Sequence, residues 1–213
     1  PKIIDLVIVS TNSDVRSTVI NNIANKSIVR FWVLEKILAQ SLVDLNEIKS
    51  VTETAKGVWV NTPRRMMPWY REIGKALQLA MPIQAHVGKG SWGLACNSIH
   101  YLDLISWWTG EELVSVNTAG LDTHWFKSKR LGFFEVSGTL KANYSGGSKL
   151  VLESKYGVEK IQNRELIKEN NKINNAKKEF QLRVQTNKGN WNIDEVKGIA
   201  SGPNGSVISG KLE

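Results

Sequence analysis

The sequence predicts an α/β chain in which a short parallel sheet with its helices is followed by an α+β part with a mainly antiparallel, open sheet. In the first 60 residues, short apolar runs alternate with amphipathic stretches, as in strand–helix–strand crossover units. From residue 113 onward, apolar runs follow one another with glycine-rich turns between them, which is typical of an antiparallel meander. We therefore expect two domains, residues 1–60 and 61–213.

The parallel part is expected to contain three strands and two helices. Residues 3–10 form a short, β-branched, mainly apolar run, which is typical of a parallel strand covered on both faces. Ser13 and Asp14 are N-cap residue types, so we expect a helix from there to about Asn25. The further predicted elements are a strand at 28–34, a helix at 42–55 and a strand at 57–60.

The second part is expected to begin with two helices, at 66–80 and 94–108, around a strand at 83–87. The predicted strands of the meander are 113–118, 133–144, 149–154 and 180–185, and residues 202–213 look like further strand and turn material.

Residues 88–93, GKGSWG, spell G-x-G-x-x-G between a predicted strand and a predicted helix. Alone, this pattern indicates a dinucleotide-binding turn. A meander rather than another parallel unit follows it, however, and the bulky Trp92 would crowd a pyrophosphate. We therefore interpret the segment as a glycine-rich turn that leads into the helix.

Composition excludes several classes of protein. Hydrophobic residues make up 41% of the 213 residues and charged residues 23%, which is ordinary for a globular protein, and no apolar run reaches the roughly 18 residues that span a membrane. The single cysteine, Cys96, excludes an internal disulfide framework, and no cluster has the spacing of a zinc site. We therefore expect a cytoplasmic protein without a metal site or a membrane partner.

The formal net charge of +8 leaves nucleic-acid binding open as one class of function. The basic residues are scattered, however, and the Lys- and Asn-rich stretch at 155–188 carries both signs of charge and few aromatic residues. We interpret that stretch as a solvated helix or long loop, and we expect no nucleic acid as a partner.

Two segments of the first part are similar to motifs of known enzymes. Residues 7–24, VIVSTNSDVRSTVINNIA, are similar to V-I-A-T-P-x-x-x-H, with Asn12 at the position of the proline and Arg16 at that of the histidine. Residues 33–39, VLEKILA, are similar to V-E-K-P-L-A, with Ile37 in place of proline.

A third segment, residues 93–111, is similar to D-x-G-x-H-x-x-D-L-x-x-x-x-x-G, with Cys96 in place of the first aspartate. Because the three motifs also agree in order and spacing, the chain resembles, over essentially its whole length, the family of glucose–fructose oxidoreductase and inositol dehydrogenase. The resemblance implies that residues 1–60 are the C-terminal part of a Rossmann dinucleotide-binding sheet and that 61–213 form a substrate-binding domain. It also implies that the family's first strand and phosphate-binding turn would precede Pro1.

The resemblance implies an NAD- or NADP-dependent oxidoreductase in which Lys36 contacts the nicotinamide and the substrate hydroxyl, and in which His100 is the acid/base. Histidine titrates near neutral pH without perturbation, and a lysine can stabilise a developing alkoxide by its charge. The alternatives are that His100 is a histidine of the core and that Lys36 is a surface lysine at a strand end. Ligands of parallel sheets bind beyond the carboxyl ends of the strands. The other predicted cofactor-binding residues lie at these carboxyl ends: they are Ser10, Thr11, Asn12 and Glu35.

Four residues are predicted to bind the substrate. Asn97 shares a helix face with His100 and could bond either its ring or a sugar hydroxyl. Arg64 and Arg65 could hold a carboxylate or phosphate through bidentate hydrogen bonds, although a surface pair at a helix start is an equal alternative. Tyr70 could stack on a sugar ring or pack in the core.

We expect an enzyme that oxidises a secondary hydroxyl of a small-molecule sugar or nucleotide-sugar, in the biosynthesis of surface polysaccharides, and that forms a homo-oligomer through its open sheet. The main alternative is a non-catalytic sugar- or nucleotide-binding relative, because the family's aspartate falls on Cys96. A basic nucleic-acid-binding module, suggested by the net charge, is the weaker alternative.

Overall fold

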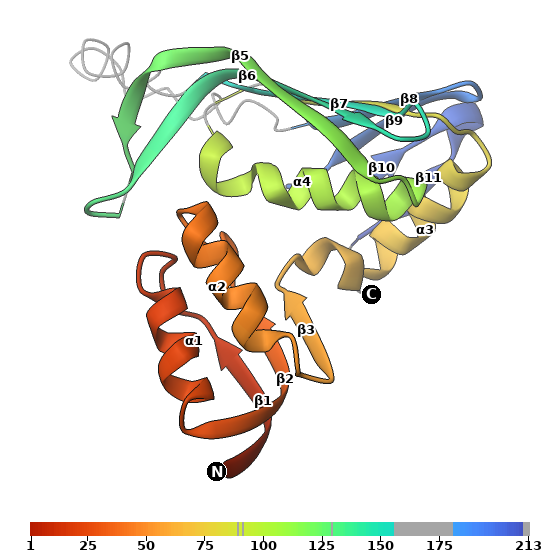
Figure 1. Ribbon diagram of the computed structural model, residues 1–213. Helices are drawn as coiled ribbons and strands as arrows, with labels where there is room; N and C mark the ends of the chain where they lie inside the picture. The colour runs from red at the N-terminus through yellow and green to blue at the C-terminus, as the bar shows by residue number, and fades with distance from the viewer. Residues whose placement is uncertain (89, 91, 129, 156–180, 211–213) are drawn as a thin grey trace, which may run out of the picture. The chain divides into compact units, whose positions relative to one another are not determined.

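The computed structural model describes residues 1–88, 90, 92–128, 130–155 and 181–210. The chain divides into two compact units, Pro1–Thr62 and Pro63–Glu213 (Figure 1). This division falls beside the expected boundary, while a cofactor role for the first unit and a substrate role for the second stay predictions. Residues 156–180, most of the Lys- and Asn-rich stretch, lie outside the described residues.

The first unit is a parallel sheet of three strands in the order β1-β2-β3. Its elements along the chain are β1 (Lys2–Val9), α1 (Arg16–Ala24), β2 (Ser27–Leu34), α2 (Leu42–Thr52) and β3 (Gly57–Val60). Val9 pairs with Leu34, and Leu34 pairs with Val60, so the carboxyl ends of the three strands meet at one edge of the sheet. The predicted parallel α/β unit is confirmed.

The coverage of β1 differs from the prediction. Ile20 of α1 and Ile48 of α2 pack in a core with Trp32 of the sheet, whereas Ile3 and Ile8 of β1 are 59% and 66% exposed. The prediction that β1 is covered on both faces is wrong, because the two helices of this unit cover only one face of the sheet.

The predicted N-cap of the first helix is also wrong. α1 begins at Arg16 after Val15, and no side chain caps it. Ser13 and Asp14 belong to the turn before the helix, so neither is its N-cap residue.

The second unit is an eight-stranded sheet in the order β11-β10-β9-β8-β4-β7-β6-β5. Among the described strand pairs of this second sheet, β4–β7 is the one parallel pair. The elements along the chain are η1 (Pro63–Met66), α3 (Pro68–Gln78), β4 (Gln84–Gly88), α4 (Leu94–Thr109), β5 (Leu113–Lys127), β6 (Phe134–Tyr144), β7 (Lys149–Ser154), β8 (Gln181–Thr186), β9 (Gly189–Asp194), β10 (Ile199–Ser201), η2 (Pro203–Gly205) and β11 (Val207–Ser209).

One face of this sheet is covered by α3 and α4 (Figure 1). The two helices contribute Tyr70, Ile73, Leu104 and Trp108 to the core, and Trp108 Nε1 donates a hydrogen bond of 2.9 Å to the carbonyl of Tyr70. β5, at the edge of the sheet, is exposed along almost its whole length. The mainly antiparallel, open sheet is therefore confirmed.

The G-x-G-x-x-G segment connects β4 to α4, and α4 leads into β5, which is antiparallel to its neighbour β6. Lys89 and Ser91 lie outside the described residues, while Gly90 has a φ of 99°, a conformation that favours glycine. Within the described ranges, no helix is long and apolar enough to cross a membrane.

Candidate functional site

Glu35 joins the ends of the three parallel strands. Its backbone N–H donates to the carbonyl of Val9 at 3.0 Å. Its carboxylate accepts hydrogen bonds from the backbone N–H of Lys36 at 3.1 Å and from Asn61 Nδ2 at 2.9 Å. The residues that follow β1, β2 and β3 are therefore held together at one edge, as the sequence predicted for the ends of parallel strands.

Arg16 lies beneath two loops of this edge. Its side chain is 1% exposed, and its guanidinium donates hydrogen bonds to the carbonyls of Thr11, Ile37 and Leu38. The Lys36–Ile37 peptide bond is cis. Burial lowers the pKa of the Arg16 guanidinium from its ordinary value, against the negative charges of Glu35 and Asp14, which raise it.

The predicted cofactor-binding residues all belong to this edge. Thr11, Glu35 and Lys36 are half-buried, and Ser10 and Asn12 are exposed. Backbone groups of Thr11 and Lys36 are fixed by Arg16 and Glu35 respectively. In the sequence Arg16 is only a departure from the family motif, and its role at this edge was not predicted.

In the second unit, His100 and Asn97 lie on α4. His100 is 9% exposed, whereas Cys96 and Asn97 are half-buried. The burial of His100 agrees both with a core histidine and with a residue of an enclosed site.

A carboxylate that the sequence analysis missed lies at the start of α4. Glu135 of β6 is 7% exposed, and its Oε2 accepts a hydrogen bond of 2.9 Å from the backbone N–H of Ala95 in the first helical turn. A Cβ on Gly93 would lie 2.5 Å from Glu135 Oε1 and 3.3 Å from Asn97 Nδ2, so these groups lie close together and a larger residue here would require the Glu135 carboxylate to shift. The signal in the sequence is a single acid inside the apolar run at 133–136.

Arg64 is held by a carboxylate of the chain itself. Its Nε and one terminal nitrogen each donate to Glu195 at 2.8 Å, and its guanidinium lies 4.4 Å from the centre of the Tyr101 ring. The hydroxyls of Tyr70 and Tyr101 also donate to Glu195. Glu195 follows β9, so this buried cluster ties the β9–β10 turn to η1, α3 and α4.

The pKa directions agree with this arrangement. Burial alone would raise the pKa of the Glu195 carboxyl, but the charge and hydrogen bonds of Arg64, with the bonds from Tyr70 and Tyr101, lower it below the ordinary value. Burial and the charge of Glu195 raise the pKa of both phenols. Glu195 is therefore the anion of the cluster, and the two tyrosines are its neutral donors.

Arg65 makes a similar bidentate pair with Asp103, in which Nε lies 2.7 Å from Oδ2 and a terminal nitrogen lies 2.5 Å from Oδ1. Both arginines therefore make bidentate hydrogen bonds, Arg64 with Glu195 and Arg65 with Asp103. Tyr70 is 1% exposed and packs in the core. A contact of Arg64, Arg65, Tyr70 or Asn97 with a substrate stays a prediction.

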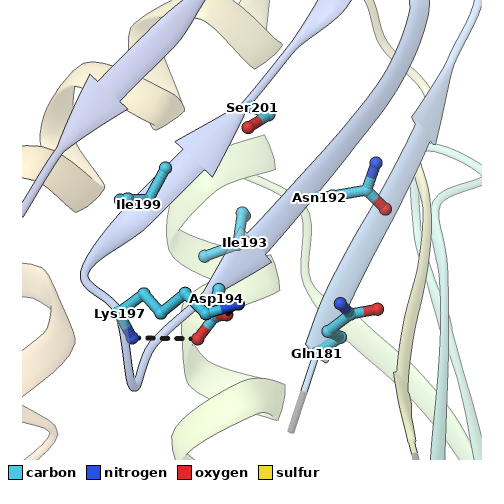
Figure 2. Close-up of a pocket in the computed structure, with 7 residues that line it drawn as sticks. All are labelled: Gln181, Asn192, Ile193, Asp194, Lys197, Ile199 and Ser201. Carbon is cyan, nitrogen blue, oxygen red and sulfur yellow. Dashed lines mark hydrogen bonds and ion pairs between the residues drawn. The ribbon is translucent and has the colours of Figure 1, made fainter. Parts of the chain in front are cut away.

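Two shallow pockets lie away from these residues. One, of about 190 Å³, is lined by residues of β8, β9, β10 and the β9–β10 turn, where Lys197 and Asp194 form an ion pair of 3.2 Å (Figure 2). The other, of about 500 Å³, lies over β5 and β6. Neither is lined by a predicted site residue. Among the residues that the structure covers, no group of three or more His, Cys, Asp or Glu side chains could hold a metal ion.

No family model matches the chain, and no curated protein matches it significantly. Solved structures do match. Aldose–aldose oxidoreductase from Caulobacter crescentus is 17% identical with a TM-score of 0.68, covering 97% of this chain and 62% of that protein. UDP-N-acetylglucosamine 3-dehydrogenase from Acidithiobacillus ferrooxidans is 13% identical with a TM-score of 0.66, covering 99% and 64%.

Myo-inositol dehydrogenase from Lactobacillus casei, crystallised with NAD(H) and myo-inositol, is 15% identical with a TM-score of 0.59, covering 89% of this chain and 54% of that protein. The chain thus spans less than two thirds of the length of each of the three structures. At these identities the likeness shows the fold, which is the fold that the motif resemblance implied.

Proposed function

We propose that this chain acts in a nicotinamide-dependent oxidoreductase that transfers a hydride between its cofactor and a secondary hydroxyl of a sugar or nucleotide-sugar. The observation that carries the proposal is the carboxyl edge of the parallel sheet. There, Lys36 follows β2 in a loop fixed by Glu35 and Arg16, within a fold shared with sugar and polyol dehydrogenases. Because a shared fold does not imply a shared function, the proposal depends on the side chains at this edge.

The groups at this edge fit the nicotinamide end of a dinucleotide. Thr11 Oγ1 is buried and has no hydrogen-bond partner in the part of the chain that the structure describes, so a polar group such as a carboxamide can bond it. We assign Ser10, Thr11, Asn12, Glu35 and Lys36 to this end of the cofactor. A bound nicotinamide would supply the acceptor or donor of the hydride.

The chain's own residues would handle the proton and the charge. When a secondary alcohol is oxidised, its hydroxyl proton must be taken up, and the imidazole of His100 is the group that we assign to this step. The ammonium group of Lys36 would stabilise the negative charge that develops on the same oxygen. We assign each role from the motif that the residue matches, Lys36 in the first unit and His100 in the second.

The substrate class is inferred from the structural relatives, which are described as acting on UDP-N-acetylglucosamine, myo-inositol and aldoses. We therefore propose a sugar or nucleotide-sugar substrate, used in building surface polysaccharides in the cytoplasm. The exposed strand β5 supports the further expectation of a homo-oligomer through the open sheet.

The test is a screen of sugars and nucleotide-sugars with NAD and NADP, using the product of the full reading frame that encodes this chain. Lys36→Ala should lower kcat by at least about 100-fold, the scale for losing a charge-stabilising donor, while the Kd of the cofactor changes less than about threefold. Lys49→Ala is the matched control, because Lys49 is an exposed lysine of α2 in the same unit. Turnover of Lys36→Ala within about threefold of the wild type would contradict the proposal.

A second candidate function is a non-catalytic binding protein for the same ligands. The observation that favours it is Cys96, a half-buried thiol where the family motif has a carboxylate. This candidate requires that the wild type binds cofactor and sugar without turnover, which the same screen with a parallel binding measurement detects.

A further inference from the structure

Arg16 is one of the largest fully buried side chains of the chain, and neither the fold nor the proposed proton and hydride steps explain it. It is the first residue of α1, where a charged side chain is ordinarily exposed. Burial of a guanidinium costs free energy unless its N–H groups are hydrogen-bonded. What Arg16 bonds to therefore indicates what it does.

The three hydrogen bonds of Arg16 connect two loops. One terminal nitrogen donates to the carbonyls of Ile37 and Leu38, the latter at 3.1 Å, and the other donates to the carbonyl of Thr11. Ile37 and Leu38 directly follow Lys36, and Thr11 is the second residue after the end of β1. A guanidinium is planar and rigid, so its two ends fix the spacing between these loops.

The apolar core of the first unit lies between the sheet and its two helices. That core is apolar and is built from the strands and the inner faces of both helices, with Ile20, Trp32, Leu34 and Ile48 fully buried. All acceptors of the Arg16 bonds are loop carbonyls at the carboxyl edge. Arg16 thus bonds the loops that carry the candidate site.

We propose that Arg16 is a positioning residue: its guanidinium holds the Lys36 loop against the Thr11 loop and thereby fixes the orientation of the Lys36 side chain toward the reacting hydroxyl. The role in turnover rests on the proposed function, whereas the connection between the loops does not. The motif that the chain resembles has histidine at this position, and a neutral imidazole ring has a single N–H, which cannot bond carbonyls of both loops at once.

The first test needs no ligand. Arg16→Lys keeps the charge but loses the planar fork. In hydrogen exchange, the amides of residues 11–13 and 36–40 should exchange at least about tenfold faster, while the amides of β2 keep their protection. Arg30→Lys is the matched control, because Arg30 of β2 is 47% exposed and pairs with Asp5 at 2.6 Å, so it should leave both loops unchanged.

Two results of this test would overturn the proposal. Wild-type exchange in both loops would show that Arg16 does not hold them, and an equal loss of protection throughout the first unit would show that it supports the fold as a whole. Arg16→His is a second variant, which introduces the motif's own residue and should fold. It is expected to give the same local increase in exchange, and wild-type exchange in this variant too would count against the proposal.

The second test measures turnover per folded molecule, with the folded fraction taken from circular dichroism. Arg16→Lys should lower kcat by about 10- to 100-fold, the scale for a small misplacement of a reacting group, and change the KM values by less than about threefold. If Lys36→Ala retains turnover, the proposed function fails and hydrogen exchange alone decides on Arg16. If Lys36→Ala is inactive while Arg16→Lys turns over like the wild type, only the positioning role is refuted.

Discussion

Replacing Glu195 with glutamine should destabilise the second unit, because it removes the one anion of the buried cluster. Glu195 accepts two hydrogen bonds of 2.8 Å from Arg64 and further bonds from Tyr70 and Tyr101. The side chains of Arg64 and Glu195 are 16% and 20% exposed. The substitution leaves the guanidinium without a counter-charge in a largely desolvated site.

The magnitude follows from that burial. Removing one partner of a fully buried ion pair costs about 3–5 kcal/mol, and an exposed pair is worth about 0–1 kcal/mol. Because the pair is mostly buried and glutamine still offers one acceptor oxygen, we expect a loss of about 2–3 kcal/mol. For a unit of this size the loss corresponds to a decrease in Tm of about 5–10 °C.

The effect should depend on pH in one direction. The pKa of Glu195 in the folded state lies below the ordinary value of 4.5, so its ionised form favours folding. The stability difference between wild type and variant should be complete above about pH 5.5 and should disappear as the pH falls through the folded-state pKa.

Urea unfolding followed by circular dichroism at several pH values measures this difference. Glu72→Gln is the control, because Glu72 is an exposed acid of α3 in the same unit. A loss below about 1 kcal/mol at neutral pH, or a difference that stays the same down to pH 3, would refute the assignment of Glu195 as the anion of the cluster.

Three further predictions concern α4. Glu135→Gln should lower the stability of the second unit by about 1 kcal/mol in urea unfolding, since a charged acceptor at a helix N-terminus is lost. Gly93→Ala should cost about 1–3 kcal/mol in the same assay, because the new Cβ would lie 2.5 Å from Glu135 Oε1; wild-type stability would show that the contact is relaxed without cost. His100→Asn should slow sugar oxidation by about 100-fold in initial rates, as expected for loss of a general base, and an unchanged rate would remove His100 from the chemistry.

Local sequence patterns predicted the limits of the short strands, whose ends are marked by residues next to the strand itself. β3 and β7 have the predicted limits, because each is a short apolar run bounded by glycine or polar residues. β5 was predicted to stop at Thr118 but continues to Lys127. Its second half pairs with β6 around Gly120 and Gly138.

In the sequence a glycine just after an apolar run, such as Gly120, indicates a turn. Here, a Cβ on Gly120 would lie 2.9 Å from the carbonyl oxygen of Thr139 on the neighbouring strand, and Gly138 has a φ of 107°. Both glycines permit a close approach of two backbones inside an irregular ladder. The length of β5 is therefore set by its long-range pairing and was not readable from its own residues.

The same limit applies to the candidate site. Lys36 and His100 were proposed from motifs. The cofactor-binding residues at the strand ends were proposed because ligands of parallel sheets bind beyond the carboxyl ends of the strands. The partners of Arg64 were not predicted, because Glu195 lies 131 residues further along the chain. Glu135 and Arg16 were missed as site residues, since only the folded chain brings Glu135 to the start of α4 and the guanidinium of Arg16 to three loop carbonyls.

The central claim is that a hydride moves between a sugar carbon and a nicotinamide with the help of Lys36. The most direct measurement is a single-turnover reaction of the full reading frame's product with the sugar or nucleotide-sugar found in the screen, deuterated at the carbon that bears the reacting hydroxyl. The account predicts that mass spectrometry finds the deuterium in the reduced nicotinamide with the wild type, and that Lys36→Ala binds both ligands but transfers at least about 100-fold more slowly. Oxidation of the sugar without deuterium in the nicotinamide, or equal transfer by Lys36→Ala, would contradict it.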